Sequence, residues 1–390
     1  MIAYNEKDLD NLHIRDQVEK AIAENCMSKE ESAQVSAVHP VAFYTPNIYI
    51  RIGLFILTVV IVTFSFGLLT LIVFSSGSSD GAIQALLIIA GLACFGVLET
   101  MIAKKRHFQS GVDDALLWMG AALLLSGIYW SSGRISPLSL SLIVFSIALI
   151  CTLRYIDRLM ALVAFGALLA VVFYFVLESL GTTGKIIAPF LLMAVSITLY
   201  FFCSSLLKKE GVRHYHSSLV LIRAATLVSF YLAGNYFVVR EMTIQLFDLP
   251  SPAFHLPMGW LFWILTLTTP LFYIYRGLQK KDTTFLWVGL ALVAATICTV
   301  RHYYAILPIE GAMTIGGIIL IAIAYAAIQY LKIPRHGFTY KEQTGKHVIE
   351  LLHIESIVIS EIAAPPGGPS SEGIKFGGGS GGGGGAGGQF

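Results

Sequence analysis

Charged side chains are scarce within the long apolar runs of this sequence, and the few that occur there are the first candidates for chemistry. Glu99 and Arg223 are two residues of this kind. A charge inside an apolar, membrane-crossing segment is energetically costly and often marks a functional position. An arginine can extend its head to the membrane surface, whereas the shorter glutamate cannot. Glu99 is therefore the stronger candidate, with Lys104 or Arg223 able to pair with it, and Arg223 can equally be an anchor or a structural partner.

A second group of polar residues is centred on a proline. Thr268 and Thr269 immediately precede Pro270 within the apolar run 258–277. Proline leaves a backbone carbonyl without its helical hydrogen bond, and interrupted helices of this sort form binding sites in transporters. Threonine also bonds the backbone of its own helix, so a kink without a site is the structural alternative. Asn235, in another run, either joins this intramembrane polar site or hydrogen-bonds a neighbouring helix.

Catalytic and metal-binding signatures are absent from the sequence. It contains no HExxH or GxxxxGK[ST] pattern, and its two GxSxG matches, at 77–81 and 378–382, lie in a short polar break and in the glycine-rich tail, so neither is a nucleophile elbow. Asp113 and Asp114 are adjacent, so on a helix they point in different directions and do not form an acid/base pair facing one substrate. His214 and His216 are too few for a metal site, and the five cysteines share no ligand spacing. We therefore expect no enzymatic activity, no cofactor and no metal.

The elements that would position these residues are membrane helices. Of the 390 residues, 56% are hydrophobic and only 13% are charged, about half the charged share of a soluble protein. A span of about 20 mostly apolar residues crosses a bilayer. Such runs occur at 50–74, 82–103, 112–131, 137–153, 158–178, 186–206, 217–238, 258–277, 283–300 and 311–331. The sequence predicts an all-α, polytopic transmembrane bundle of about ten helices that contacts the lipid bilayer.

The distribution of basic residues predicts how this bundle is oriented. The breaks after the second, fourth, sixth and eighth runs are rich in Lys and Arg, as is the segment after the tenth, whereas the alternate breaks hold few. Basic loops remain in the cytoplasm, so both termini are expected there. The net charge of +2 is too small to indicate nucleic acid as a partner.

Polar segments flank the predicted transmembrane domain, which spans 47–331. Residues 1–46 read as a cytoplasmic helical hairpin, in which Ser28 and Glu31 form a capping-box signature. Residues 332–364 form a cytoplasmic juxtamembrane segment, and 365–390 a Pro/Gly-rich tail expected to be disordered. Phe376 and Phe390 are aromatic residues of that tail that could dock on a partner.

Two resemblances follow from these residues. The first concerns the hairpin and the segments before the first and last spans. These resemble uncharacterised bacterial polytopic inner-membrane proteins classed as a domain of unknown function. The segments are Phe43 to Asn47 and Arg51 to Gly53 before the first span, and Arg301 to Tyr304 with Leu307 and Pro308 before the last. This resemblance implies a bacterial inner-membrane location and no activity. The glycine-rich ending from Phe376 to Phe390 is similar to the tails of membrane-anchored TPM-domain proteins, although no TPM domain is present.

Two functional hypotheses follow. The first is a non-enzymatic assembly or scaffolding component that binds other membrane proteins through its N-terminal hairpin and its C-terminal tail. The second is a small-molecule transporter laid out like the drug/metabolite transporters, as two inverted five-helix repeats. No matching residues are visible between the two halves of the sequence, and the outer loop 239–257 has no counterpart in the first half.

Overall fold

The computed structural model describes residues 2–23, 26–75, 80–131, 135–247 and 256–303, with isolated positions at 311, 314, 317, 318, 321, 325 and 329. The chain divides into two compact units, Met1–Tyr340 and Lys341–Phe390, and every described residue belongs to the first. The segments 332–364 and 365–390, with Phe376 and Phe390, lie outside the described residues, as does most of the run 311–331.

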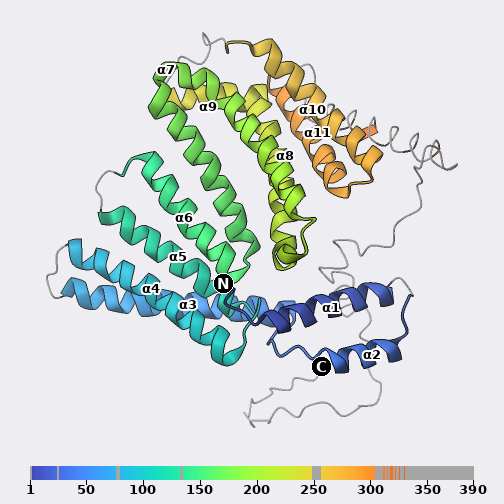
Figure 1. The fold of residues 1–390 in the computed structure, drawn as a ribbon. Coiled ribbons are helices and arrows are strands. Elements are labelled where there is room, and N and C mark those ends of the chain that lie inside the picture. Colours follow the sequence, from blue (N-terminus) through green and yellow to red (C-terminus); the bar gives the residue numbers. More distant parts are fainter. Residues whose placement is uncertain are drawn as a thin grey trace, which may run out of the picture. The chain divides into compact units, whose positions relative to one another are not determined.

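Helices account for nearly all of the described secondary structure (Figure 1). The described residues contain no strand, only an isolated bridge between Tyr44 and His107. Within them, eight segments are long and apolar enough to cross a membrane. The described part of the chain is thus all-helical, and the chain is a multi-pass membrane protein. The eight segments are Ile48–Ser75, Gly81–Lys105, Val112–Trp130, Pro137–Tyr155, Arg158–Gly181, Thr183–Leu206, Gly211–Gly234 and Thr283–Tyr303.

The fifth and sixth of these segments follow each other without a loop. Helix α7 (Arg158–Leu206) contains both, joined at Gly181, whose φ of 53° and ψ of −121° are not helical. A straight helix of 49 residues would extend about 74 Å, more than twice the hydrocarbon thickness. The chain reverses instead, since a Cβ added to Gly184 would lie 2.6 Å from the Val176 carbonyl oxygen. The expected break of several residues is therefore a single-glycine turn.

The second half of the transmembrane region also differs from the predicted runs. The run 217–238 is divided at Asn235 into α8 (His216–Gly234) and the short α9 (Tyr236–Phe247). Helix α10 (Gly259–Lys280) continues through Pro270 and packs beside α11 (Thr283–Tyr303). Its buried stripe includes Thr266, Thr269 and Tyr273, and this polar content explains why α10 is not among the eight apolar segments.

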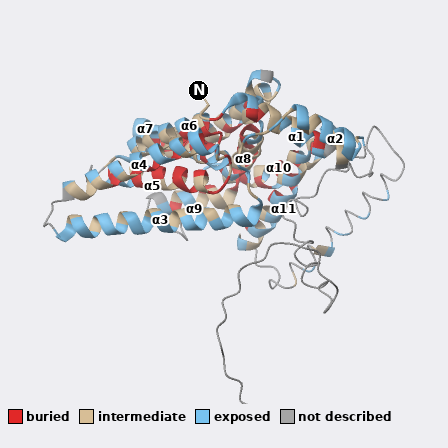
Figure 2. Cartoon of the chain, turned by 90° about the horizontal axis from the view of Figure 1, so that it is seen from below, coloured by how far each residue is buried: buried red, intermediate tan, exposed pale blue. Residues whose placement is uncertain are grey.

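Close helix pairs form the core of the unit. Helices α4 (Asp80–Lys105) and α5 (Val112–Ser131) lie alongside each other, as do α6 (Pro137–Tyr155) and α7 (Figure 1). At Gly91 an added Cβ would lie 2.8 Å from the backbone nitrogen of Leu124, so glycine permits this approach. Helix α3 (Ile48–Ser75) has no buried residue and is tan and blue along its length in Figure 2. Lipid is the solvent that such an apolar surface requires.

The N-terminal helices are joined to the ends of the membrane helices. Helices α1 (Glu6–Ala23) and α2 (Lys29–Val38) contact each other, and the capping box expected at Ser28 and Glu31 is present. Ahead of α1, the backbone nitrogen of Ala3 donates to the carbonyl of Arg154, at a distance of 2.9 Å. Tyr4 is 7% exposed and belongs to the same apolar core as Leu98 of α4.

Candidate functional site

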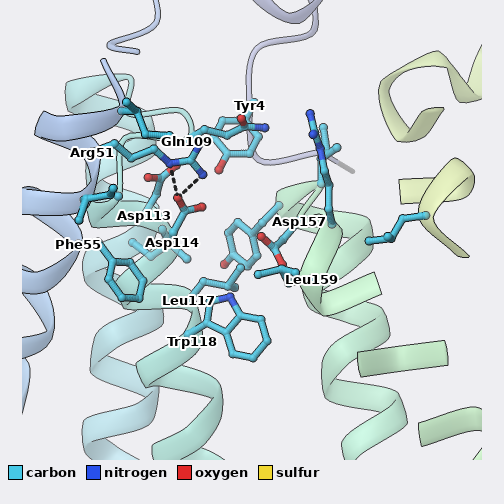
Figure 3. Close-up of a pocket in the computed structure, with 18 residues that line it drawn as sticks. Tyr4, Arg51, Phe55, Gln109, Asp113, Asp114, Leu117, Trp118, Asp157 and Leu159 are labelled. Atoms are coloured by element: carbon cyan, nitrogen blue, oxygen red, sulfur yellow. Dashed lines mark hydrogen bonds and ion pairs between the residues drawn. The ribbon is translucent and has the colours of Figure 1, made fainter. Parts of the chain in front are cut away.

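A cavity of about 700 Å³ lies where α3, α5 and α7 begin and α6 ends (Figure 3). We call it the acidic cavity, because three carboxylates line it against two arginines. The charged lining residues are Arg51, Asp113, Asp114, Asp157 and Arg158. Its remaining lining is largely apolar and includes Phe55, Leu117 and Trp118. A volume of this size can hold a small organic molecule.

Arg51 and Asp114 form the ion pair on one side of the acidic cavity. The Arg51 Nη2 and Nε atoms donate to Asp114 Oδ2 at 2.6 and 3.1 Å, shown as dashed lines in Figure 3. Gly111 holds the two helices in this register. Its φ is +92°, and an added Cβ would lie 2.1 Å from the backbone oxygen of Arg51. Only glycine fits there, so the loop before α5 fixes the distance between the pair.

Asp113 points its carboxylate into the loop rather than toward Arg51. Its Oδ1 accepts hydrogen bonds from the backbone nitrogen and the Oγ of Ser110, at 2.8 and 3.0 Å. Ser110 Oγ in turn lies 2.7 Å from His107 Nδ1. The adjacent carboxylates thus have different partners, as expected for neighbours on a helix. Both nevertheless line the same cavity, although adjacent residues on a helix point in different directions.

Asp157 lies on the opposite side of the acidic cavity (Figure 3). It caps α7 by accepting a hydrogen bond from the Met160 backbone nitrogen at 2.6 Å. Burial raises the pKa of the Asp157 carboxyl, although its bonds to backbone N–H groups oppose this shift. Tyr4 also lines the cavity, and burial raises the pKa of its hydroxyl, with a further contribution from Asp113. Tyr4 is therefore a neutral phenol.

Glu99 lies next to the acidic cavity and has a different partner from those expected. Its Oε1 accepts from Arg154 Nε at 2.5 Å and from the Tyr155 hydroxyl at 2.7 Å. The expected pairing with Lys104 or Arg223 is wrong, because the end of α6 supplies a closer arginine. Tyr155 also lines the cavity, so this cluster adjoins it.

The other predicted site residues lie elsewhere. Arg223 donates to Asp282 Oδ1 at 3.3 Å and to Thr284 Oγ1 at 3.1 Å, which ties α8 to the start of α11. Thr268 is exposed and bonds the Ile264 carbonyl of its own helix, whereas Thr269 is buried. The structure therefore does not bring the predicted intramembrane polar residues into one site.

Asn235 and Pro270 belong to one network of hydrogen bonds. Proline leaves the carbonyl four residues earlier without a helical donor, and Thr296 Oγ1 lies 3.2 Å from that Thr266 oxygen. Thr266 Oγ1 accepts from the backbone nitrogen of Tyr236, where α9 begins, at 3.0 Å. The side-chain nitrogen of Asn235 donates to Tyr231 and Thr299. Threonine side chains of α10 and α11 thus bond the backbone groups freed at the two interruptions, which favours a structural interpretation.

The acidic cavity has charge of both signs above an apolar floor. Among the described residues no three His, Cys, Asp or Glu side chains come close enough together to hold a metal ion. The cavity is suited to an organic cation with an apolar part, since carboxylates attract the charge and Trp118 and Phe55 offer apolar contact. Sequence reasoning missed Arg51, Asp157 and Tyr4, although each lies at the end of a predicted run or just before the first helix.

A comparison with protein-family models, curated proteins and solved structures found no match to this chain.

Proposed function

We propose that this chain is a non-enzymatic assembly component of the bacterial inner membrane that contacts partner proteins through its cytoplasmic ends. The N-terminal hairpin carries the proposal. Asp10 of α1 forms an ion pair with Arg213, and the Ala3 nitrogen bonds the Arg154 carbonyl. A partner bound to the hairpin would therefore be coupled to the membrane helices, while much of the outer surface of α1 and α2 is exposed.

The proposed placement has ten spans and both termini in the cytoplasm. The two spans beyond the eight apolar segments are α10 and the run 311–331. The alternation of basic loops supports this orientation, because the ends that gather at the acidic cavity then lie on the basic side. The glycine-rich tail from Phe376 to Phe390 is a second contact for partners under this proposal, and nucleic acid is not one of them.

A small-molecule transporter is the second candidate, and the acidic cavity is the observation that favours it. The connections between helices speak against two inverted five-helix repeats, however. Such repeats would make the α4–α5 and α8–α10 connections equivalent. The first is the short loop 106–111, whereas the second contains α9. Because these two connections differ, we rank the assembly proposal above the transporter.

The test is a mild-detergent purification with an affinity tag between α9 and α10. It compares the full chain with one that ends at Ile362 and one that lacks residues 6–38. An unrelated multi-pass protein carrying the same tag is the control bait. Assembly predicts a defined membrane partner that is lost with one truncation or both. A chain that purifies alone in all three forms contradicts it, and a thermal-shift screen of organic cations against wild type and Asp114→Asn would then test transport.

A further inference from the structure

A second cavity of about 600 Å³ lies between α1 and the ends of the membrane helices. We call it the basic cavity. Arg51, Arg158 and Arg213 line it together with His13, His214 and His216, whereas Asp16 is the only carboxylate among its lining residues. It shares Arg51 and Arg158 with the acidic cavity. The arginines outnumber the carboxylate among the lining residues, although Asp114 and Asp10 lie beside two of them.

Two of the three arginines already have carboxylate partners. Arg51 pairs with Asp114, and Arg213 pairs with Asp10. Arg158 and the His216 ring have no ion pair or side-chain hydrogen bond within the described part of the chain. Arg158 and His216 are both exposed residues, and no group in the described part of the chain pairs with either side chain.

Ser218 also lines the basic cavity and points to a ligand independently of these charges. The residue is 2% exposed, and its buried Oγ has no hydrogen-bond partner among the described residues. A buried hydroxyl without a partner costs free energy and calls for an explanation. Ser217 and Ser218 follow a 3₁₀ turn, Glu210–Tyr215, that runs directly into α8, and the His216 N–H donates to the Arg213 carbonyl, so the start of α8 is not a free helix N-terminus.

We propose that the basic cavity binds a phosphate group. Arg158 supplies charge and donors, the His216 ring supplies a further polar group, and Ser218 supplies the buried hydroxyl. Arginine matches phosphate because its planar head can donate two parallel hydrogen bonds. The cavity adjoins the ends of membrane helices, so either a lipid headgroup or a soluble phosphate ester can supply this group. The inference does not depend on the assembly role.

The experiment follows the unfolding midpoint of the purified full chain by intrinsic tryptophan fluorescence. Maltoside micelles are used because their headgroups carry no phosphate, and ionic strength is held constant with chloride. One arm titrates glycerol 3-phosphate. The other adds phosphatidylglycerol to the micelles, with diacylglycerol as the matched lipid that lacks phosphate.

Two variants and two matched controls test the cavity itself. Ser218→Ala removes a buried hydroxyl that has no partner among the described residues, so without probe the midpoint should be unchanged or slightly higher. Arg158→Gln removes the unpaired charge. Each is expected to weaken the apparent affinity for the probe about tenfold or more, as for a lost hydrogen bond to a charged group. Ser196→Ala, another buried hydroxyl without a partner among the described residues, and Lys105→Gln, an exposed charge at the end of α4, should leave the affinity unchanged.

A saturable rise of the midpoint with glycerol 3-phosphate supports a soluble phosphate ester. A rise with phosphatidylglycerol but not with diacylglycerol supports a lipid headgroup. Either rise supports the proposal only if it is weaker in Ser218→Ala than in wild type. If neither probe raises the midpoint, or if Ser218→Ala responds as wild type does, the proposal is overturned. The partner purification is unaffected by these outcomes, so the two proposals can fail separately.

Discussion

Gly111 gives the sharpest test of how the acidic cavity is held together. In Gly111→Ala the new Cβ would lie 2.1 Å from the Arg51 backbone oxygen and 3.0 Å from the Phe55 nitrogen. The start of α3 would have to retreat by more than about 1 Å to restore an ordinary contact. The φ of +92° adds backbone strain, because a residue with a Cβ rarely adopts this conformation.

The expected loss of stability combines these two effects. Backbone strain costs about 1–3 kcal/mol, and overpacking at a close contact costs a similar amount. At roughly 2–4 °C per kcal/mol, the unfolding midpoint in detergent should fall by about 5 °C or more. The same movement separates Arg51 from Asp114. Asp114→Ala should therefore lower the midpoint less in the Gly111→Ala background than in wild type.

The matched control is Gly96→Ala in α4, since an added Cβ there meets nothing within 4 Å. That change should leave the midpoint unchanged or raise it slightly, because alanine favours helix more than glycine does. If Gly111→Ala unfolds at the same temperature as Gly96→Ala, the result contradicts the close approach of Gly111 to the start of α3. If the effects of Gly111→Ala and Asp114→Ala simply add, the glycine does not position the ion pair.

Three further predictions concern other parts of the chain, all read from the unfolding midpoint. Gly181→Ala should cost about 1–3 kcal/mol of stability, because Gly181 has a positive φ. Gly166→Ala is the control, since an added Cβ there has open space, and it should not lower the midpoint. Equal midpoints for the two variants would contradict the turn inside α7. Thr296→Val removes a hydroxyl that joins α11 to the Thr266 carbonyl (3.2 Å) and to the Tyr231 hydroxyl (2.9 Å), and it should cost about 1–3 kcal/mol. Thr198→Val, whose hydroxyl bonds only its own helix, is the control and should unfold later. Because the pKa of Asp157 is raised above 3.8, the folded chain holds this proton to higher pH than the unfolded chain, so stability is lost as pH rises from 3.8 through the raised pKa. Asp157→Asn keeps a capping oxygen without this titration, so its midpoint should fall less than that of wild type as pH rises, and parallel curves would refute the shift.

Apolar runs predicted the membrane helices well, because about 20 consecutive apolar residues have few other uses. The differences lie where a single residue alters the backbone. Gly181 turns the chain inside an otherwise continuous apolar stretch, and Asn235 ends α8 inside a predicted run. Hydropathy is averaged over a window of many residues, so a single glycine or asparagine hardly changes the average. The run 258–277 forms a helix, but its buried threonines and tyrosine reduce its apolar character.

The acidic cavity was harder to predict because its residues come from distant parts of the chain. A search for charge inside apolar runs found Glu99 and passed over Arg51 and Asp157, which lie at helix ends. Helix ends are the ordinary place for charges, so their types carried no signal by themselves. Only the packing of α3 against α5 puts Arg51 beside Asp114. Asp113 and Asp114 have different partners, as their adjacency predicts, but the loop before α5 brings both to the same cavity.

The contacts of the N-terminal segment have a consequence for the order of events during synthesis. Ala3 bonds Arg154, and Asp10 pairs with Arg213, so both contacts join residues that leave the ribosome far apart in time. At translation rates of about 5–20 residues per second, Arg213 is made roughly 10–40 s after Asp10. Until α6 and the start of α8 are in place, the hairpin lacks both of these polar contacts. The first helices made are thus among the last to reach their native contacts, and a nascent chain halted before residue 154 should leave them accessible to protease.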